Sequence, residues 1–215
     1  MAARTGKQVL QRFREDPPNL WINGERVTDP TTHPSTRNAV NSLAALYDMQ
    51  HSPELVEKMT VTSPTSGDLV GRSFVIPKSK EDLCRRSEMH KVWADASLGH
   101  MGRTPDYMNV NVMAAGTAGE YFAQIQPRFG ENIANYFEYV RENDLTLTHA
   151  LTSPQIDKSK QVNEFDDPYI ALGVVKETSS GIIVRGARML ATLPLSDEIL
   201  TVSYTHLTLP TNREV

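Results

Sequence analysis

The chain has 215 residues, of which 39% are hydrophobic and 22% are charged, proportions that are ordinary for a globular protein. Its formal net charge of −4 provides no basic field, so we expect no nucleic-acid partner. The one cysteine, Cys84, excludes a disulfide framework and a cysteine-rich zinc site, and we expect its side chain to be buried or half-buried.

The N-terminal segment MAARTGKQVLQRFRED lacks the apolar core of a signal peptide. No stretch approaches the roughly 18 consecutive apolar residues that a membrane-spanning helix needs. We therefore expect a cytoplasmic protein with no membrane partner.

The first predicted elements are a hairpin and a helix. An Asn-Gly pair within residues 20–28 separates two short alternating runs, which is the pattern of a hairpin with a type I′ turn. After a proline-punctuated loop, residues 35–51 predict a helix that Ser35 or Thr36 caps. Its expected apolar face consists of Ala39, Leu43, Leu46 and Tyr47.

A turn-rich loop begins at Pro64, and a long helix is predicted after Ser79. Ser79 and Asp82 form an S-x-x-D capping motif, and Gly99 and Gly102 are expected to end the helix. The residues at helical spacing are Leu83, Arg86, His90, Trp93 and Ala94.

Two more helices are expected before the chain changes character. One begins at Pro105, with Thr104 as its cap and Asp106 in its first turn, and it runs through VNVMAAGTAGEYFA. The other covers residues 129–142. Its apolar stripe consists of Ile133, Tyr136, Phe137 and Val140.

Helical periodicity is lost after Asp144. Two strands are predicted over residues 169–177 and 182–188, joined by a turn at 179–181. Helices followed by strands indicate an α+β protein with segregated layers. We expect a mainly helical domain over 1–150 and the beginning of a β domain over 151–201.

The last residues, 202–215, do not continue the β pattern. The stretch VSYTHLTLPT resembles one reading frame of a transposase-type sequencing adapter. We therefore expect a non-native tail and assign no function to Tyr204 or His206; the alternative is a natural strand ending.

Two candidate site residues lie where the long helix ends and the next helix begins. Arg103 lies just before the expected cap, and Tyr107 lies in the first turn of the next helix. A guanidinium, a phenol and a helix N-terminus together suit an oxygen that carries negative charge. The alternative is a structural arginine paired with Asp106 beside a packed tyrosine.

Three further segments have polar candidates. His149 lies among threonines and is either a hydrogen-bonded structural residue or a group that exchanges protons with a bound hydroxyl. Residues 155–158 are either a solvated turn or a ligand-binding loop, and Thr192 either faces solvent or binds a ligand. We expect no metal, because the histidines lack paired spacing, and no dinucleotide fingerprint, phosphate-binding loop or G-x-S-x-G serine is present.

Several segments together resemble the oxygenase component of 4-hydroxyphenylacetate 3-monooxygenase, a two-component phenol hydroxylase family. The resemblance covers almost all of residues 5–200. The segments that carry it are INGERV, TTHPSTRNAV, LYDMQH, SPTSGDLVGRSFVIPKSKEDL, KVWADASLGHMGRTPDYMNV, YVRENDLTLTHALTSPQIDKSK and GIIVRGARMLATL. It implies an acyl-CoA dehydrogenase-like fold: an N-terminal helical domain, a middle β domain, and a C-terminal helical bundle that this chain lacks.

The resemblance also implies the reaction. A separate NADH-dependent flavin reductase supplies reduced FAD, and the oxygenase uses it with O₂ to hydroxylate a phenol at the ortho carbon, giving a catechol. The leading substrate is 4-hydroxyphenylacetate. The resemblance further implies a homotetramer for the full-length protein.

Site roles follow from matching motifs. The segments R-x-P-D-Y and T-H-A-L imply that Arg103, Tyr107 and His149 hold the substrate hydroxyl, with His149 also beside the cofactor and moving protons. The flavin would be contacted by Gln155, Ile156, Asp157, Lys158 and Thr192.

Two alternatives are retained. A lyase similar to 4-hydroxybutyryl-CoA dehydratase, which uses FAD with an iron–sulfur cluster, needs several cysteine ligands, whereas Cys84 is alone here. The other alternative is an inactive truncated fragment that exposes apolar surface.

Overall fold

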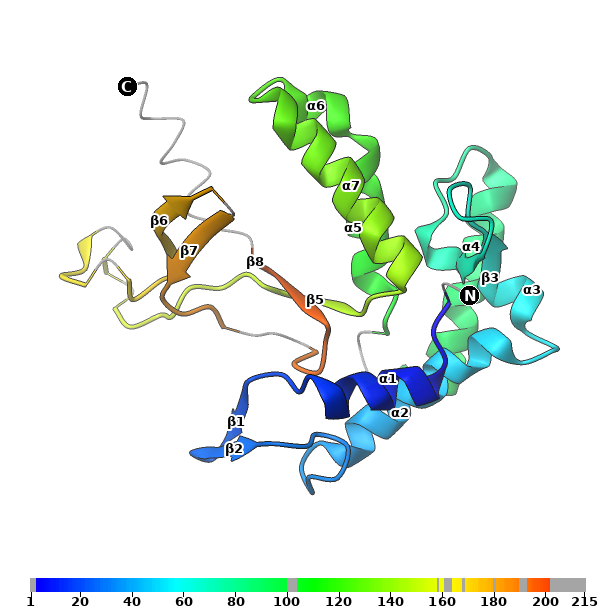
Figure 1. Cartoon of the computed structure of the whole chain (residues 1–215), viewed down its shortest axis with the longest axis horizontal. Coiled ribbons are helices and arrows are strands. Elements are labelled where there is room, and N and C mark those ends of the chain that lie inside the picture. Colours follow the sequence, from blue (N-terminus) through cyan, green and yellow to red (C-terminus); the bar gives the residue numbers. More distant parts are fainter. Residues whose placement is uncertain are drawn as a thin grey trace. The chain divides into compact units, whose positions relative to one another are not determined.

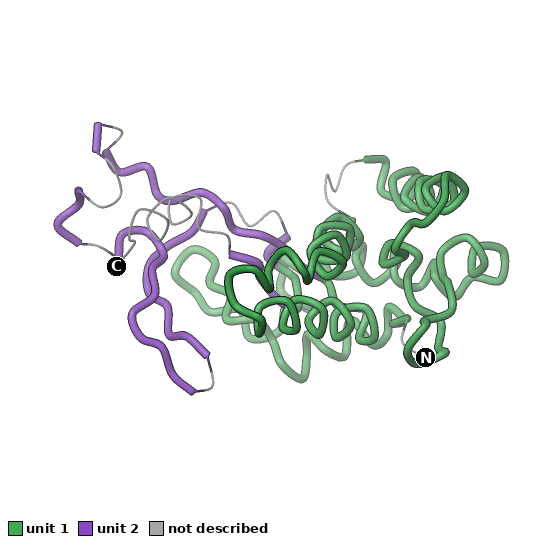
Figure 2. Tube along the Cα trace, turned by 90° about the horizontal axis from the view of Figure 1, so that it is seen from above, with its two compact units in different colours: residues 1–146, 195–197 green, residues 147–194, 198–215 purple. Residues whose placement is uncertain are grey.

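A computed structural model describes residues 3–99, 104–157, 159–160, 164–167, 169–179, 181–189 and 193–201 (Figure 1). The chain divides into two compact units (Figure 2). Unit 1 comprises residues 1–146 and 195–197, and unit 2 comprises residues 147–194 and 198–215. The expected domain boundary at residue 150 and the expected non-native tail stay predictions, and residues 202–215 lie outside the described part of the chain.

Unit 1 begins with a helix that the sequence analysis did not predict, α1 (Gly6–Glu15). Thr5 and Gln8 form a reciprocal capping box at its start, which satisfies backbone donors that the helix leaves unpaired. Val9 and Phe13 face inward at helical spacing and contribute to the core cluster shared with α2.

The predicted hairpin is confirmed by β1 (Leu20–Ile22) and β2 (Glu25–Val27), which pair antiparallel. Its turn residues have φ values of 52° at Asn23 and 84° at Gly24. Positive φ at both central residues is what a type I′ turn requires.

The predicted second helix is α2 (Arg37–Asp48), continued by the 3₁₀ helix η1 (Met49–His51). Thr36 occupies the cap position, but its hydroxyl donates to the Pro30 carbonyl at 2.7 Å and does not cap the helix. The expected apolar face is wrong at Ala39, which is exposed, because Val40 takes the inward position.

The turn-rich segment after α2 holds a hairpin that was not predicted. Its short elements are α3 (Val56–Met59), β3 (Thr60–Thr62), β4 (Leu69–Gly71) and the 3₁₀ helix η2 (Arg72–Phe74). The two strands pair antiparallel. Strands of this length give little sequence signal, because they span less than two periods of alternation.

The long helix is α4 (Lys80–Ala96), and the capping box of Ser79 and Asp82 is confirmed. Gly99 follows the helix with φ of 62°, while Gly102 lies outside the described residues. Met89 and Trp93 are buried, and the Trp93 indole donates to the Leu46 carbonyl at 2.8 Å.

One expectation about α4 is wrong. Cys84 is exposed, not buried or half-buried, and the nearby Leu83 is 47% exposed. The face centred on Met89 and Trp93 packs inward, and Leu83 and Cys84 lie off that face, exposed to solvent.

The next helices lie side by side in Figure 1: α5 (Tyr107–Thr117), α6 (Gly119–Ala123) and α7 (Pro127–Asn143). The predicted single helix is interrupted at Ala118. In α7 the predicted stripe is confirmed, with Phe137 and Val140 buried.

Unit 2 contains two pairs of strands. β5 (Leu147–Ala150) pairs parallel with β8 (Glu198–Thr201), and β6 (Gly173–Thr178) pairs antiparallel with β7 (Gly181–Arg185). The second pair confirms the predicted hairpin with shorter strands. The first pair was not predicted: the chain forms a strand at Leu147–Ala150, ahead of the two predicted strands.

A buried polar cluster joins residues 195–197 to the rest of unit 1. The Arg4 guanidinium contacts the Asp197 carboxylate at 2.7 Å, and its backbone N–H donates to Asp144 at 2.9 Å. Gln50 donates to the same Asp144 carboxylate at 2.8 Å. Burial raises the pKa of Asp144, and the Arg4 charge opposes that shift.

Within the described residues, no helix has both the length and the apolar character that crossing a membrane requires.

Candidate active site

The start of α5 holds the first predicted site residue, Tyr107, which is half-buried. The helix begins two residues later than expected, with Asp106 at the cap position. Thr104 does not cap it; its hydroxyl is hydrogen-bonded to the Asp106 carboxylate instead. Arg103 lies outside the described residues, so its expected pairing with Asp106 or with a substrate stays a prediction.

The cap residue Asp106 is also in contact with α4. His90 of α4 places Nε2 3.0 Å from Oδ2 of Asp106, whose side chain is only 7% exposed. This contact is an ion pair only when the imidazole is protonated, and Nε2 makes no hydrogen bond within the described residues. Burial lowers the pKa of His90; the Asp106 charge acts in the opposite direction.

The first turn of α5 is also held by η2. The buried Asn109 amide donates to the Ser73 hydroxyl at 2.9 Å, and both residues are at most 2% exposed. Tyr107 therefore projects from a helix start that is fixed on two sides, which is a favourable base for a binding residue.

In unit 2, His149 is the half-buried member of β5, between buried Thr148 and Ala150. The neighbouring Thr148 hydroxyl accepts a hydrogen bond from the Leu193 N–H at 3.2 Å. The backbone of His149 is therefore held in position by the strand and by the residues next to it.

The expected flavin loop follows β5 directly. Gln155, Ile156 and Asp157 are exposed. The Asp157 carboxylate accepts from the Ser159 hydroxyl at 2.7 Å and from its N–H at 2.9 Å, and these hydrogen bonds lower the pKa of Asp157. Lys158 and Thr192 lie outside the described residues.

The predicted site residues thus fall in two places. Tyr107 belongs to unit 1, whereas His149 and the loop residues Gln155 to Asp157 follow one another along a single segment of unit 2. That Tyr107 and His149 bind the same substrate hydroxyl stays a prediction.

The sequence analysis did not single out Arg188, although it lies in one of the segments that carry the family resemblance. Its Nη1 donates to the Leu151 carbonyl at 3.4 Å and is hydrogen-bonded to the Ser153 hydroxyl. The adjacent Met189 N–H donates to the Thr152 carbonyl at 2.8 Å. The available sequence signal was its place in GIIVRGARMLATL, a few residues before the expected flavin contact Thr192.

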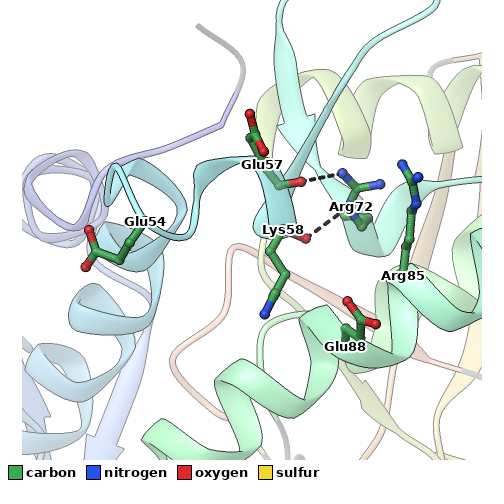
Figure 3. Close-up of a pocket in the computed structure, with 6 residues that line it drawn as sticks. All are labelled: Glu54, Glu57, Lys58, Arg72, Arg85 and Glu88. Carbon is green, nitrogen blue, oxygen red and sulfur yellow. Dashed lines mark hydrogen bonds between the residues drawn. The ribbon is translucent and has the colours of Figure 1, made fainter.

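A hollow in unit 1 is a separate feature (Figure 3). It measures about 340 Å³ and is lined by Glu54, Glu57, Lys58, Arg72, Arg85 and Glu88. Arg72 directs its donors to the backbone carbonyls of Glu57 and Lys58, as the dashed lines show. The hollow contains none of the predicted residues, and its mixed charges favour no ligand class.

Among the residues that the structure describes, no cluster of three or more His, Cys, Asp or Glu side chains is placed to hold a metal ion.

Comparison with known proteins decides the family. The model of the family described as 4-hydroxyphenylacetate 3-hydroxylase N terminal matches residues 5–214. The chain belongs to this family. The matched residues include the helices of unit 1 and the strands of unit 2.

Curated relatives of the chain include named oxygenase components. The 4-hydroxyphenylacetate 3-monooxygenase oxygenase component of Thermus thermophilus is 51% identical over 92% of this chain and 40% of its own length. The corresponding protein of Geobacillus is 46% identical over 93% of this chain, again over 40% of its length. The chain thus spans about 40% of these relatives.

Solved structures establish the fold. A crystal structure of such an oxygenase component, complexed with FAD and 4-hydroxyphenylacetate, has a TM-score of 0.88 and 50% identity over 94% of this chain and 41% of that one. An archaeal 4-hydroxybutyryl-CoA dehydratase has a TM-score of 0.73 at 24% identity, covering 96% of this chain and 41% of that one, a likeness of fold alone. The expected acyl-CoA dehydrogenase-like fold is confirmed.

Proposed function

We propose that this chain is the N-terminal part of the oxygenase component of a two-component, FAD-dependent monooxygenase. The reaction is ortho-hydroxylation of a phenol to a catechol. The observation that carries the proposal is 50% identity, over 94% of the chain, to an oxygenase component solved with FAD and 4-hydroxyphenylacetate. That complex also makes 4-hydroxyphenylacetate the best-supported substrate.

The catalytic unit is longer than this chain, which spans about 40% of its relatives. The tests below therefore use a completed chain. We define it as this sequence to Thr201, continued either from its own gene or by fusion to the remaining part of the Thermus thermophilus relative.

For the substrate, we assign Tyr107, Arg103 and His149 to the phenol oxygen. Tyr107 and the N–H groups at the start of α5 would donate hydrogen bonds to this oxygen as it gains negative charge, and Arg103 would supply a positive charge. His149 would accept the phenol proton at a ring nitrogen. Ionisation of the phenol raises electron density at the ortho carbon, which is the atom to be oxidised.

For the cofactor, the residues of unit 2 fit FAD. Two buried guanidinium nitrogens of Arg188 have no acceptor within the described residues. Gln155 and Asp157 are exposed and lie shortly after Ser153, to which Arg188 is hydrogen-bonded. Gln155, Ile156, Asp157, Lys158 and Thr192 would hold FAD, together with His149. When bound, reduced FAD supplies the activation of O₂.

The remaining partners follow from the two-component class. We propose that an NADH-dependent flavin reductase delivers reduced FAD, that O₂ is the co-substrate, and that the full-length protein is a homotetramer. A cytoplasmic location is consistent with this chemistry, because NADH is the reductant.

The lyase alternative is disfavoured by one observation. An iron–sulfur cluster needs several thiolates, and Cys84, the one cysteine of the chain, is exposed on α4. Iron analysis of the completed chain distinguishes the two: the monooxygenase proposal predicts no stoichiometric iron, and a bound cluster would overturn it.

The direct test is an assay of the completed chain with chemically reduced FAD, air and 4-hydroxyphenylacetate. We expect the catechol 3,4-dihydroxyphenylacetate as product. Binding of FAD with release of hydrogen peroxide and no catechol from any of several phenols would contradict the proposal. The same assay on the 215-residue chain decides whether it is an inactive fragment by itself.

A further inference from the structure

We propose that Arg188 is a flavin-anchoring residue, whose free guanidinium edge binds two acceptor atoms of one anionic group of FAD. The inference rests on the proposed function and adds a residue that neither the sequence motifs nor the family resemblance assigned.

The first observation is how the guanidinium is held. Nη1 is used inside the protein, because it donates to the Leu151 carbonyl at 3.4 Å and is hydrogen-bonded to the Ser153 hydroxyl. These acceptors flank Thr152, whose backbone pairs with Met189. The guanidinium is thus attached to the short segment between His149 and the expected flavin loop.

The second observation is what Arg188 leaves unused. Nε and Nη2 are buried from solvent, and neither has a hydrogen-bond acceptor in the described part of the chain. A buried charged donor without an acceptor is unfavourable, and most such donors in folded proteins are paired. The two nitrogens therefore indicate an acceptor that a ligand brings.

The geometry of arginine narrows the ligand. Nε and Nη2 form one edge of the planar guanidinium and point their N–H groups in the same direction, an arrangement suited to two acceptor atoms of a single group. FAD has two such groups. One is its diphosphate, and the other is the N1 and C2-carbonyl edge of the ring, which is anionic in reduced flavin.

The position along the chain agrees with a role in flavin binding. Arg188 is hydrogen-bonded to Leu151 and Ser153, which lie just before Gln155 to Asp157 along the chain. It also lies shortly before Thr192, which we assign to the flavin ring. Arg188 is therefore hydrogen-bonded to the segment that leads into the expected flavin loop.

The test compares FAD binding by the completed chain and by Arg188→Gln, measured as Kd for oxidised FAD and, without oxygen, for reduced FAD. Losing a bidentate, charge-assisted contact is expected to weaken binding by roughly 10- to 100-fold. Equal losses for both redox states assign the edge to the diphosphate. A larger loss for reduced FAD assigns it to the ring.

Three control variants separate this role from a structural one. Arg185→Gln removes an exposed arginine of β7, whose guanidinium lies over the Tyr169 ring at 5.3 Å, and should leave Kd unchanged. Ser153→Ala removes the partner of Nη1 while retaining the free edge, and should change Kd by less than about 3-fold. Arg188→Lys retains the charge without the fork and should recover only part of the affinity.

Two results would overturn the inference. One is wild-type affinity for both forms of FAD in Arg188→Gln; the other is an equal loss in Arg188→Gln and Ser153→Ala, with lowered thermal stability in each before FAD is added. If the unsubstituted completed chain itself binds no FAD, the proposed function fails first, and this inference fails with it.

Discussion

At the scale of single residues, the clearest prediction concerns the role of the Tyr107 hydroxyl in turnover. If it donates to the phenol oxygen, Tyr107→Phe in the completed chain removes one preorganised donor and should lower the rate of catechol formation about 100-fold. The Kd for FAD should change little, because the ring still packs at the start of α5. Product formation by chromatography and flavin titration measure the two quantities.

The matched control is Tyr121→Phe on α6, where the side chain is 67% exposed. It should leave turnover at the level of the unsubstituted protein. Full turnover in Tyr107→Phe would remove Tyr107 from the site.

A second residue-scale expectation concerns Glu142, which anchors the turn between β3 and β4 to α7. Its carboxylate accepts from Ser63 at 2.6 Å, from Ser66 at 2.5 Å and from Arg141 at 2.7 Å. Desolvation acts to raise the pKa of Glu142, but these hydrogen bonds outweigh it, and the net pKa is lowered.

A lowered pKa sets the sign of the pH dependence. The ionised form stabilises the fold above the ordinary glutamate pKa of about 4.3, and that contribution is lost as pH falls through the lower folded-state pKa. Glu142→Gln should therefore lower the free energy of unfolding by about 1–3 kcal/mol at pH 7. Urea unfolding at successive pH values should show the two proteins converging below pH 4.3 or so.

Glu138→Gln, an exposed change on the same helix, is the control and should have little effect at any pH. A difference between Glu142→Gln and the unsubstituted protein that stays constant down to acid pH would show that the Glu142 charge is not the cause.

At the scale of elements, α6 and α7 meet through two glycines. A Cβ added at Gly130 would lie 2.5 Å from the Gly119 carbonyl oxygen, which is backbone and cannot rotate away. A glycine-to-alanine change in an exposed helix normally stabilises by about 1 kcal/mol. Here Gly130→Ala should destabilise by about 1–3 kcal/mol, because the helices are forced apart.

Chemical denaturation measures this change, with Glu131→Ala as an exposed neighbour on α7 that should be nearly neutral. Stabilisation by Gly130→Ala would mean that α6 and α7 do not approach as closely as the structure shows.

Elements with strong local signals were predictable. The capping box of Ser79 and Asp82 and the Asn23-Gly24 turn are fixed by residues a few positions apart, and both are confirmed. β5 was not predicted because its partner β8 lies far along the chain, and a short parallel strand has no local pattern of its own. Exposure of Cys84 was missed because the orientation of α4 depends on which tertiary neighbours bury Met89 and Trp93.

The candidate site was predictable only where its residues belong to a local sequence pattern. Tyr107 was expected near a helix start and is the first residue of α5. The role of Thr104 was wrong, because its hydroxyl is bonded to Asp106 and the helix begins later. Arg188 was missed because its unpaired edge is visible only once the fold brings it to Leu151 and Ser153.

At the scale of the whole molecule, the chain spans about 40% of the length of its curated relatives. Its β6–β7 hairpin exposes Val174, Ile182 and Ile183. Such apolar side chains on a two-stranded hairpin are typical of surface that further structure covers. We therefore expect the completed chain, and not the 215-residue chain by itself, to have the activity.

We propose that the completed chain transfers an oxygen atom from O₂ to a phenol. The most direct measurement is a single turnover of the completed chain with reduced FAD, 4-hydroxyphenylacetate and ¹⁸O₂, followed by mass spectrometry of the product. The account predicts a catechol that contains one ¹⁸O atom, on the carbon ortho to the original hydroxyl. Absence of the catechol, or a new hydroxyl that carries oxygen from water, would contradict it.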